Sequence, residues 1–163
     1  MVTPVDLLKR AGADTVLASV STEKLIKGRS GIKVEADALL DDLDVDSFDV
    51  LLIPGGPGVS ALQDDGRTAI LAQEFYKANK PVAAICAAPT LLRNAGLLHG
   101  KSFTAHFSVQ GELPAAQVEE RVVTDGLLTT SRGAGTALDF GLELVRRFYG
   151  EQKASEIAAS IMV

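Results

Sequence analysis

The sequence has little cysteine, few aromatic residues and no excess of positive charge. It contains one cysteine, Cys86, no tryptophan and 5% aromatic residues. A single cysteine cannot form an intrachain disulfide, so a reducing compartment is expected, in the first place the cytoplasm. The 16 Lys and Arg against 21 Asp and Glu give a net charge of −5, which argues against nucleic acid as a partner. No apolar run approaches the roughly 20 residues that span a bilayer, so no membrane association is expected.

Hydrophobic residues make up 47% of the 163 residues, enough to bury the core of one domain covering residues 1–163. Helical and strand patterns alternate along the chain. Residues 48–54 and 81–85 are almost entirely apolar, as expected of strands covered on both faces. The alternation predicts an α/β fold with a mostly parallel sheet. The patterns predict helices over residues 3–11 (capped by Thr3), 67–78, 90–95 and 136–149, and strands over 15–20, 32–34, 48–54, 81–85, 102–107, 121–124 and 127–130.

Three segments resemble ligand-binding loops but lack the surroundings that such loops require. Residues 95–102 fit a phosphate-loop pattern, yet they lead from a helix into a strand, the reverse of the required order. The glycines within 56–61 follow a strand, but the next strand ends at Cys86 where a ribose-binding acid is needed. Residues 42–53 begin like a calcium loop and lack its glycine and closing glutamate. None of the three gives reason to expect a nucleotide or a metal.

Cys86 occupies the point where an apolar strand turns into a helix. Ala84 and Ala88 flank it at two positions on either side, and a nucleophile elbow requires such small residues because the chain reverses sharply there. The following helix offers free backbone amides, which favour thiolate over thiol. A small buried cysteine at the end of a strand is an equally good interpretation of this spacing.

The neighbouring strand ends in Gly55 and Gly56, whose backbone N–H groups are accessible to a bound oxygen. Together with the amide of Ala87 they are candidates for an oxyanion hole, because ligands bind beyond the carboxyl ends of strands in open α/β sheets. The predicted strand 102–107 brings His106 near its own carboxyl end as a candidate general base or proton carrier. A purely structural histidine is the alternative, and His99, in a turn, is the weaker candidate.

Three motifs together resemble the ThiJ/PfpI superfamily, in the order and spacing of its parkinsonism-associated deglycase (DJ-one) branch. They are LIPGG at 52–56, AAICAAP at 83–89 and TSRGAGT at 130–136. The resemblance runs from Pro4 almost to the last residue. It implies a flavodoxin-like, three-layer α/β sandwich and a homodimer.

The resemblance also implies a set of functional residues. Cys86 is the reactive cysteine and His106 the nearby histidine. The oxyanion amides fall at Gly55 and Gly56, and Arg10 and Arg29 match arginines near an anion pocket on the dimer side. Members of the family are described as glutathione-independent glyoxalases acting on methylglyoxal and glyoxal, as deglycases of early glycation adducts, and as redox sensors and chaperones in oxidative stress. None of these activities needs a metal or organic cofactor.

The sequence departs from the family pattern in two places. Peptidase-like members have a histidine directly after the nucleophile, where this chain has Ala87, so a peptidase is not expected. The family also has a first strand and a glutamate-containing turn before the helix that begins here at Thr3. We therefore expect the working protein to carry upstream residues that supply this strand and this acid.

A second function class fits the same cysteine. An accessible thiolate oxidises readily to sulfenic and sulfinic acid, so a non-catalytic, redox-sensing chaperone is the alternative to an enzyme.

Overall fold

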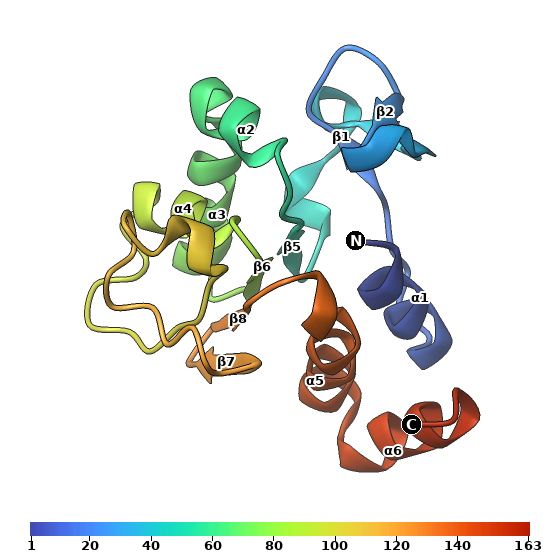
Figure 1. The fold of residues 1–163 in the computed structure, drawn as a ribbon. Helices are drawn as coiled ribbons and strands as arrows, with labels where there is room; N and C mark the ends of the chain where they lie inside the picture. Colours follow the sequence, from blue (N-terminus) through green and yellow to red (C-terminus); the bar gives the residue numbers. More distant parts are fainter.

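The computed structural model describes residues 1–163 and is built around a four-stranded sheet (Figure 1). Its strands are β5 (Leu51–Ile53), β6 (Val82–Ile85), β7 (Val122–Asp125) and β8 (Leu128–Ser131), in the order β5-β6-β8-β7. β5, β6 and β8 run parallel, and β7 closes one edge as the antiparallel partner of β8 in a tight hairpin. All four residues of β6 are buried, which agrees with a strand covered on both faces.

Two short strand pairs lie outside this sheet. β1 (Ala18–Ser19) pairs in parallel with β4 (Ala38–Leu39), and β2 (Leu25–Lys27) pairs with β3 (Lys33–Glu35) in an exposed antiparallel hairpin. Neither pair is hydrogen-bonded to β5, so β5 is an edge strand in these residues. The expected mostly parallel sheet is therefore divided into a four-stranded part and a separate parallel pair.

Helices cover both faces of the four-stranded sheet, as Figure 1 shows. On one side lie α1 (Val2–Ala11), α5 (Ala137–Tyr149) and α6 (Glu151–Ser160), and on the other α2 (Val59–Asp65), α3 (Arg67–Lys77) and α4 (Pro89–Asn94). Successive residues of β6 contribute to two separate cores: Val82 and Ala84 pack with the α3–α4 side, Ala83 and Ile85 with the α1–α5 side. This alternation confirms the three-layer α/β sandwich. Five short 3₁₀ turns complete the chain: η1 (Arg29–Gly31), η2 (Leu40–Asp42), η3 (Val45–Ser47), η4 (Phe107–Val109) and η5 (Ala134–Thr136).

The helices expected from periodicity over 67–78, 90–95 and 136–149 are present within one residue at each end. The first helix is present too, but it begins at Val2 with Met1 at the cap position and no side-chain capping bond, so the prediction of Thr3 as the cap was wrong. α2, α6, β2 and β4 were not predicted. α6 begins directly after Gly150, whose φ of 88° redirects the chain where the sequence suggested that the helix simply ended.

The prediction of a strand over residues 102–107 was wrong. The backbone N–H groups in this segment bond to side chains and turns instead of to a neighbouring strand: that of Ser102 donates to Asp125 and that of Thr104 to the hydroxyl of Thr130. Phe103, Thr104 and Ala105 are buried in succession, yet the segment belongs to no ladder. The expected strand over 15–20 likewise shortens to two residues.

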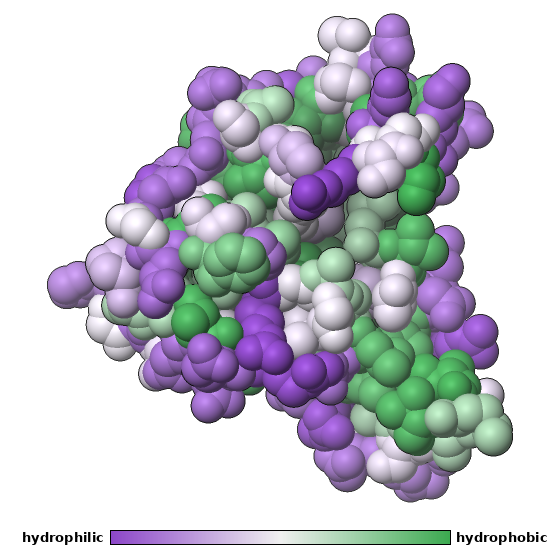
Figure 2. All heavy atoms as spheres, viewed as in Figure 1, coloured by the Kyte–Doolittle hydropathy of each residue, from purple (hydrophilic) through white to green (hydrophobic).

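Most of the surface in Figure 2 is hydrophilic, and hydrophobic residues gather on the side where α1 and α6 lie. Val2, Met162 and Val163 are among the exposed large hydrophobic residues of these two chain ends. None of the helices combines the length and apolar character that a bilayer crossing requires.

Gly141 allows α5 to lie directly on α1. A Cβ atom at this position would lie 2.5 Å from Leu7 Cδ1 and 3.1 Å from the Cα of Pro4. We expect Gly141→Ala to lower the free energy of unfolding by about 1–3 kcal/mol, because overpacking outweighs the gain of about 1 kcal/mol in helix propensity. Urea denaturation measures this change. Gly111→Ala is the control, since nothing lies within 4 Å of its added Cβ; equal effects of the two variants would contradict the proposed close contact.

Candidate active site

Cys86 has a backbone conformation that is rare for a residue with a side chain. Its φ is 67°, in the left-handed region, directly after the last residue of β6. Hydrogen bonds hold the turn on both sides: the Cys86 N–H donates to the Ser131 carbonyl (2.8 Å), and the Cys86 carbonyl accepts from the His106 N–H (2.9 Å). The thiol is free and half-buried. Such a strained turn between a strand and a helix is the geometry of a nucleophile elbow.

Gly55 lies directly against this turn. A Cβ atom on Gly55 would lie 2.5 Å from the Cβ of Cys86, 2.5 Å from the Ile85 carbonyl oxygen and 3.2 Å from the Ala87 nitrogen. β5 and β6 are parallel neighbours, so the loops that follow them meet at the same edge of the sheet. Only a glycine permits so close an approach.

Three backbone N–H groups around Cys86 have no acceptor within the chain. They belong to Gly55, Gly56 and Ala87, and none of them donates a backbone or side-chain hydrogen bond. Gly56 has a φ of 106°, which turns the chain sharply beside the cysteine. Unpaired amides at the carboxyl ends of two strands are suited to stabilise negative charge on a bound oxygen.

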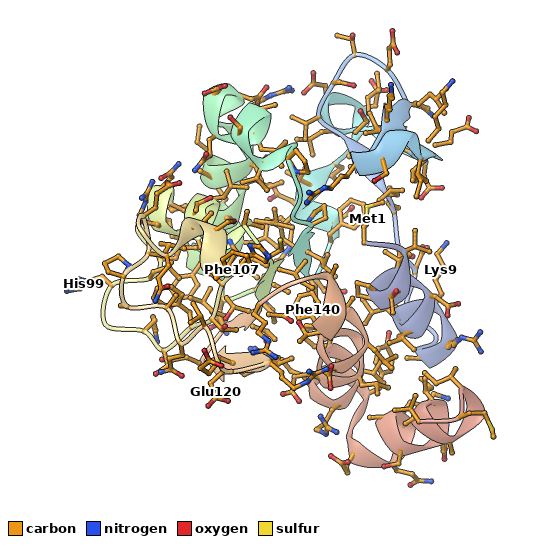
Figure 3. The ribbon with its side chains drawn as sticks, viewed as in Figure 1. Met1, Lys9, His99, Phe107, Glu120 and Phe140 are labelled. Atoms are coloured by element: carbon orange, nitrogen blue, oxygen red, sulfur yellow. The ribbon has the colours of Figure 1, made fainter.

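His106 is joined to the elbow through its backbone and is oriented by its neighbours. Its Nδ1 lies 2.8 Å from the hydroxyl of Ser108 and accepts from the Ser108 N–H at 3.2 Å. The ring centroid lies 4.3 Å from that of Phe107, and a Cβ on Gly133 would lie 3.3 Å from the His106 Cδ2. His99 lies far out on a loop in Figure 3, whereas the His106 N–H is bonded to the Cys86 carbonyl, so of the two histidines it is His106 that lies at the elbow.

The family model described as DJ-1/PfpI family matches residues 1–147. The chain belongs to the DJ-1/PfpI family. This confirms the resemblance drawn from the three motifs. The crystal structure of Drosophila melanogaster DJ-1beta superimposes with a TM-score of 0.93 at 32% identity, covering 99% of this chain and 89% of that one. The fold is therefore the flavodoxin-like sandwich of the family.

Named relatives in the DJ-1/PfpI family include two enzymes. The glutathione-independent glyoxalase DJR-1.2 of Caenorhabditis elegans is 32% identical over 93% of this chain and 82% of its own length. Deglycase PfpI of Pyrococcus furiosus is 30% identical over 90% of this chain and 89% of its own. Protein DJ-1 homolog B of Arabidopsis thaliana is 36% identical over 98% of this chain, which spans only 37% of that relative's length.

The segment that carries His106 is held in this DJ-1/PfpI fold by polar contacts. The carboxylate of Asp125, at the end of β7, accepts from the Ser102 N–H (2.9 Å) and pairs with the Lys101 ammonium (3.0 Å). The Ser102 amide and then the Lys101 ammonium hold the pKa of Asp125 below its usual value of 3.8. Thr104 N–H donates to the Thr130 hydroxyl (2.9 Å). These bonds tie the segment to β7 and β8 and so place His106 beside Cys86.

Sequence reasoning missed two contributors to the site. Ser108 contacts the His106 ring. The only sign of this contact in the sequence is that Ser108 follows His106 by two residues. Gly133 lies against the same ring, and the sequence indicated it only as one residue of the motif at 130–136. Within that motif the hydroxyls of Ser131 and Thr136 are 2.6 Å apart, which fixes the loop that carries Gly133.

Other expected site residues lie apart from Cys86. Arg10 is in the last turn of α1 and pairs with Asp6 (2.9 Å), and Arg29 lies in the exposed turn η1. No hydrogen bond joins either arginine to the elbow, so the anion pocket stays a prediction. No carboxylate bonds to Cys86 or His106 in these residues, and the glutamate expected upstream also stays a prediction.

A hollow of about 300 Å³ lies elsewhere, between residues 40–45 and α3, and does not include Cys86. It is lined by both apolar and charged side chains, among them Leu43, Ile70 and Glu74. This hollow is therefore separate from the candidate site at the elbow.

The contact between Gly55 and the elbow gives a direct test. We expect Gly55→Ala to lower the free energy of unfolding by about 1–3 kcal/mol and to slow alkylation of Cys86, since the added methyl group displaces the turn. Chemical denaturation and the rate of iodoacetamide labelling, followed by intact mass, measure the two effects. In the control Gly58→Ala nothing lies within 4 Å of the new Cβ, so both values should match the wild type. Unchanged labelling and stability in Gly55→Ala would show that the elbow does not need this glycine.

Proposed function

We propose that the protein is a cysteine-dependent, cofactor-free glyoxalase or deglycase that acts on methylglyoxal, glyoxal or early glycation adducts. The observation that carries the proposal is the strained Cys86 turn, with three unpaired amides next to it. A nucleophile beside free hydrogen-bond donors is what addition to a carbonyl requires. The printed names of two relatives, a glutathione-independent glyoxalase and a deglycase, are consistent with this chemistry.

The mechanism begins with attack of the Cys86 thiolate on the aldehyde carbon of a small 2-oxoaldehyde. The sulfur–carbon bond forms as the carbonyl electron pair moves onto oxygen, and the amides of Gly56 and Ala87 stabilise that oxyanion. After protonation gives the hemithioacetal, the hydrogen on this carbon moves as a proton to the neighbouring carbonyl carbon and the hydroxyl hydrogen moves to the neighbouring carbonyl oxygen, with His106 assisting these proton transfers. The resulting thioester of a 2-hydroxy acid is cleaved by water, which frees the thiol.

In the deglycase version, the Cys86 thiolate displaces the thiol or amine of a hemithioacetal or aminocarbinol adduct carried by a protein or nucleotide; that group leaves in its free form, and the same hemithioacetal forms on Cys86. Either activity removes reactive carbonyl compounds and so protects against oxidative stress. We further propose that the protein works as a homodimer in the cytoplasm. The hydrophobic residues gathered around α1 and α6 are consistent with a subunit contact there (Figure 2).

A redox-sensing chaperone is the second candidate, and one observation favours it. Cys86 is free and half-buried, so an oxidant has access to it. A structure titled Toxoplasma gondii DJ-1, oxidized, has a TM-score of 0.92 and 32% identity, covering 99% of this chain and 89% of that one. In this function Cys86 is oxidised to sulfenic or sulfinic acid and no substrate is turned over.

Cys86→Ser separates the two functions. We expect the wild type to form lactate from methylglyoxal without glutathione and the variant to fall to the background rate, because a serine hydroxyl is a far weaker nucleophile than a thiolate. Enzymatic detection of lactate measures this. If the wild type forms no lactate, yet mild peroxide adds oxygen to Cys86 by mass spectrometry, the redox-sensing function replaces the enzyme.

His106→Ala tests the proton carrier. We expect turnover to fall by about a hundredfold to ten-thousandfold, the usual range for a general acid or base. Tm should change little, because the His106 side chain bonds only to Ser108, two residues away on the surface. His99→Ala, which changes the chain's other histidine, should leave turnover unchanged. A His106→Ala variant that keeps its rate but loses several degrees of Tm would assign the histidine a purely structural role.

A further inference from the structure

Ser108 directs two groups at one nitrogen of His106. Its backbone N–H donates to Nδ1 at 3.2 Å, and its hydroxyl oxygen lies 2.8 Å from the same atom. This arises because His106 is the cap residue of η4 (Phe107–Val109), so its side chain folds back over the first turn. The Ser108 N–H donates no bond to a backbone carbonyl, so the imidazole is its partner.

These contacts determine which nitrogen carries the proton. A backbone N–H only donates, so Nδ1 must be the acceptor and the neutral ring bears its hydrogen on Nε2. The Ser108 hydroxyl adds to this preference by donating to Nδ1 as well. Moving the hydrogen to Nδ1 would place two N–H groups against each other and leave the Ser108 amide unpaired.

The rest of the environment holds the ring in this orientation and leaves Nε2 available. The Phe107 ring is stacked at 4.3 Å between centroids with 33° between the planes, and Gly133 lies close to the Cδ2 edge. No hydrogen bond within the chain involves Nε2, whereas Nδ1 is bonded to Ser108. The ring therefore has one tethered nitrogen and one free N–H.

We propose that Ser108 is a positioning residue that keeps His106 in the tautomer with its hydrogen on Nε2, so that this N–H donates to a substrate oxygen. The proposal rests on the proposed glyoxalase or deglycase function for its effect on rate. In that reaction the Nε2–H group carries the proton that His106 supplies, as general acid, to the developing oxyanion, beside the backbone amides of Gly56 and Ala87. The opposite tautomer presents a lone pair to the oxyanion and repels it.

A graded set of variants removes the two donors in turn. Ser108→Thr keeps both the hydroxyl and the amide, Ser108→Ala removes the hydroxyl, and Ser108→Pro removes both. Proline suits the φ of a helical turn but disfavours the conformation of Phe107 before it, so circular dichroism and Tm accompany that variant. Ser160→Ala is the matched control, because it removes a hydroxyl that bonds a backbone carbonyl (2.8 Å) on α6.

The first readout does not depend on catalysis. Imidazole ¹⁵N chemical shifts distinguish a protonated from an unprotonated ring nitrogen, and with only two histidines in the chain His106→Ala assigns the signals. We expect the wild type and Ser108→Thr to have hydrogen on Nε2. The population with hydrogen on Nδ1 should grow in Ser108→Ala and more in Ser108→Pro.

The second readout is turnover of methylglyoxal. We expect kcat to fall about tenfold in Ser108→Ala with KM little changed, and to be restored in Ser108→Thr. The proposal is overturned if wild-type His106 carries its hydrogen on Nδ1, or if Ser108→Ala and Ser108→Pro match the wild type in both shifts and kcat. If the wild type has no turnover, the proposed function fails, while the ¹⁵N shifts still decide whether Ser108 controls the tautomer.

Discussion

Gly55 brings the loop after β5 into direct contact with the loop after β6, and the candidate site depends on that contact. The missing side chain leaves room for the Cβ of Cys86 and the Ile85 carbonyl, which a methyl group would meet at 2.5 Å. Because β5 and β6 are parallel neighbours, the contact brings amides from one strand end to the thiol at the other. The distance between nucleophile and hydrogen-bond donors is thus fixed by backbone packing and needs no flexible side chain.

The left-handed conformation of Cys86 is maintained by its surroundings. A non-glycine residue at a φ of 67° costs about 1–3 kcal/mol and persists only where other contacts determine the structure. Here β6 is fully buried between two hydrophobic cores, and backbone bonds from Ser131 and His106 hold the turn on both sides. Burial of β6 therefore supports the geometry that exposes the thiol at the edge of the sheet.

His106 lies on a loop, and hydrogen bonds from that loop to the sheet hold it in place. Its segment forms no ladder, yet Asp125 and Thr130 bind the backbone at Ser102 and Thr104. Those anchors lie on β7 and β8, so the same sheet that holds Cys86 also holds the histidine. The ring itself is oriented locally by Ser108 and Phe107, which makes its tautomer a property of a few residues on the surface.

Local sequence determined the main helices, the buried strands and the elbow. Periodicity predicts α3 and α5, continuous apolar runs predict β5 and β6, and small residues around Cys86 predict a tight turn, because each signal lies within a few residues of the chain. The free amides at Gly55 and Gly56 were predicted for the same reason. The motifs likewise identified the family correctly.

Only the tertiary structure decided how distant segments meet. Residues 102–107 are predicted as a strand, but a strand needs a partner, and the N–H groups of Ser102 and Thr104 bond to side chains on β7 and β8 instead. The same limit applies to the division of the sheet beside β5, to α6 beyond Gly150, and to the contacts of Gly133 and Ser108 with His106. Sequence patterns report the environment that a residue prefers, whereas hydrogen-bond partners and close contacts depend on which other segments fold against it.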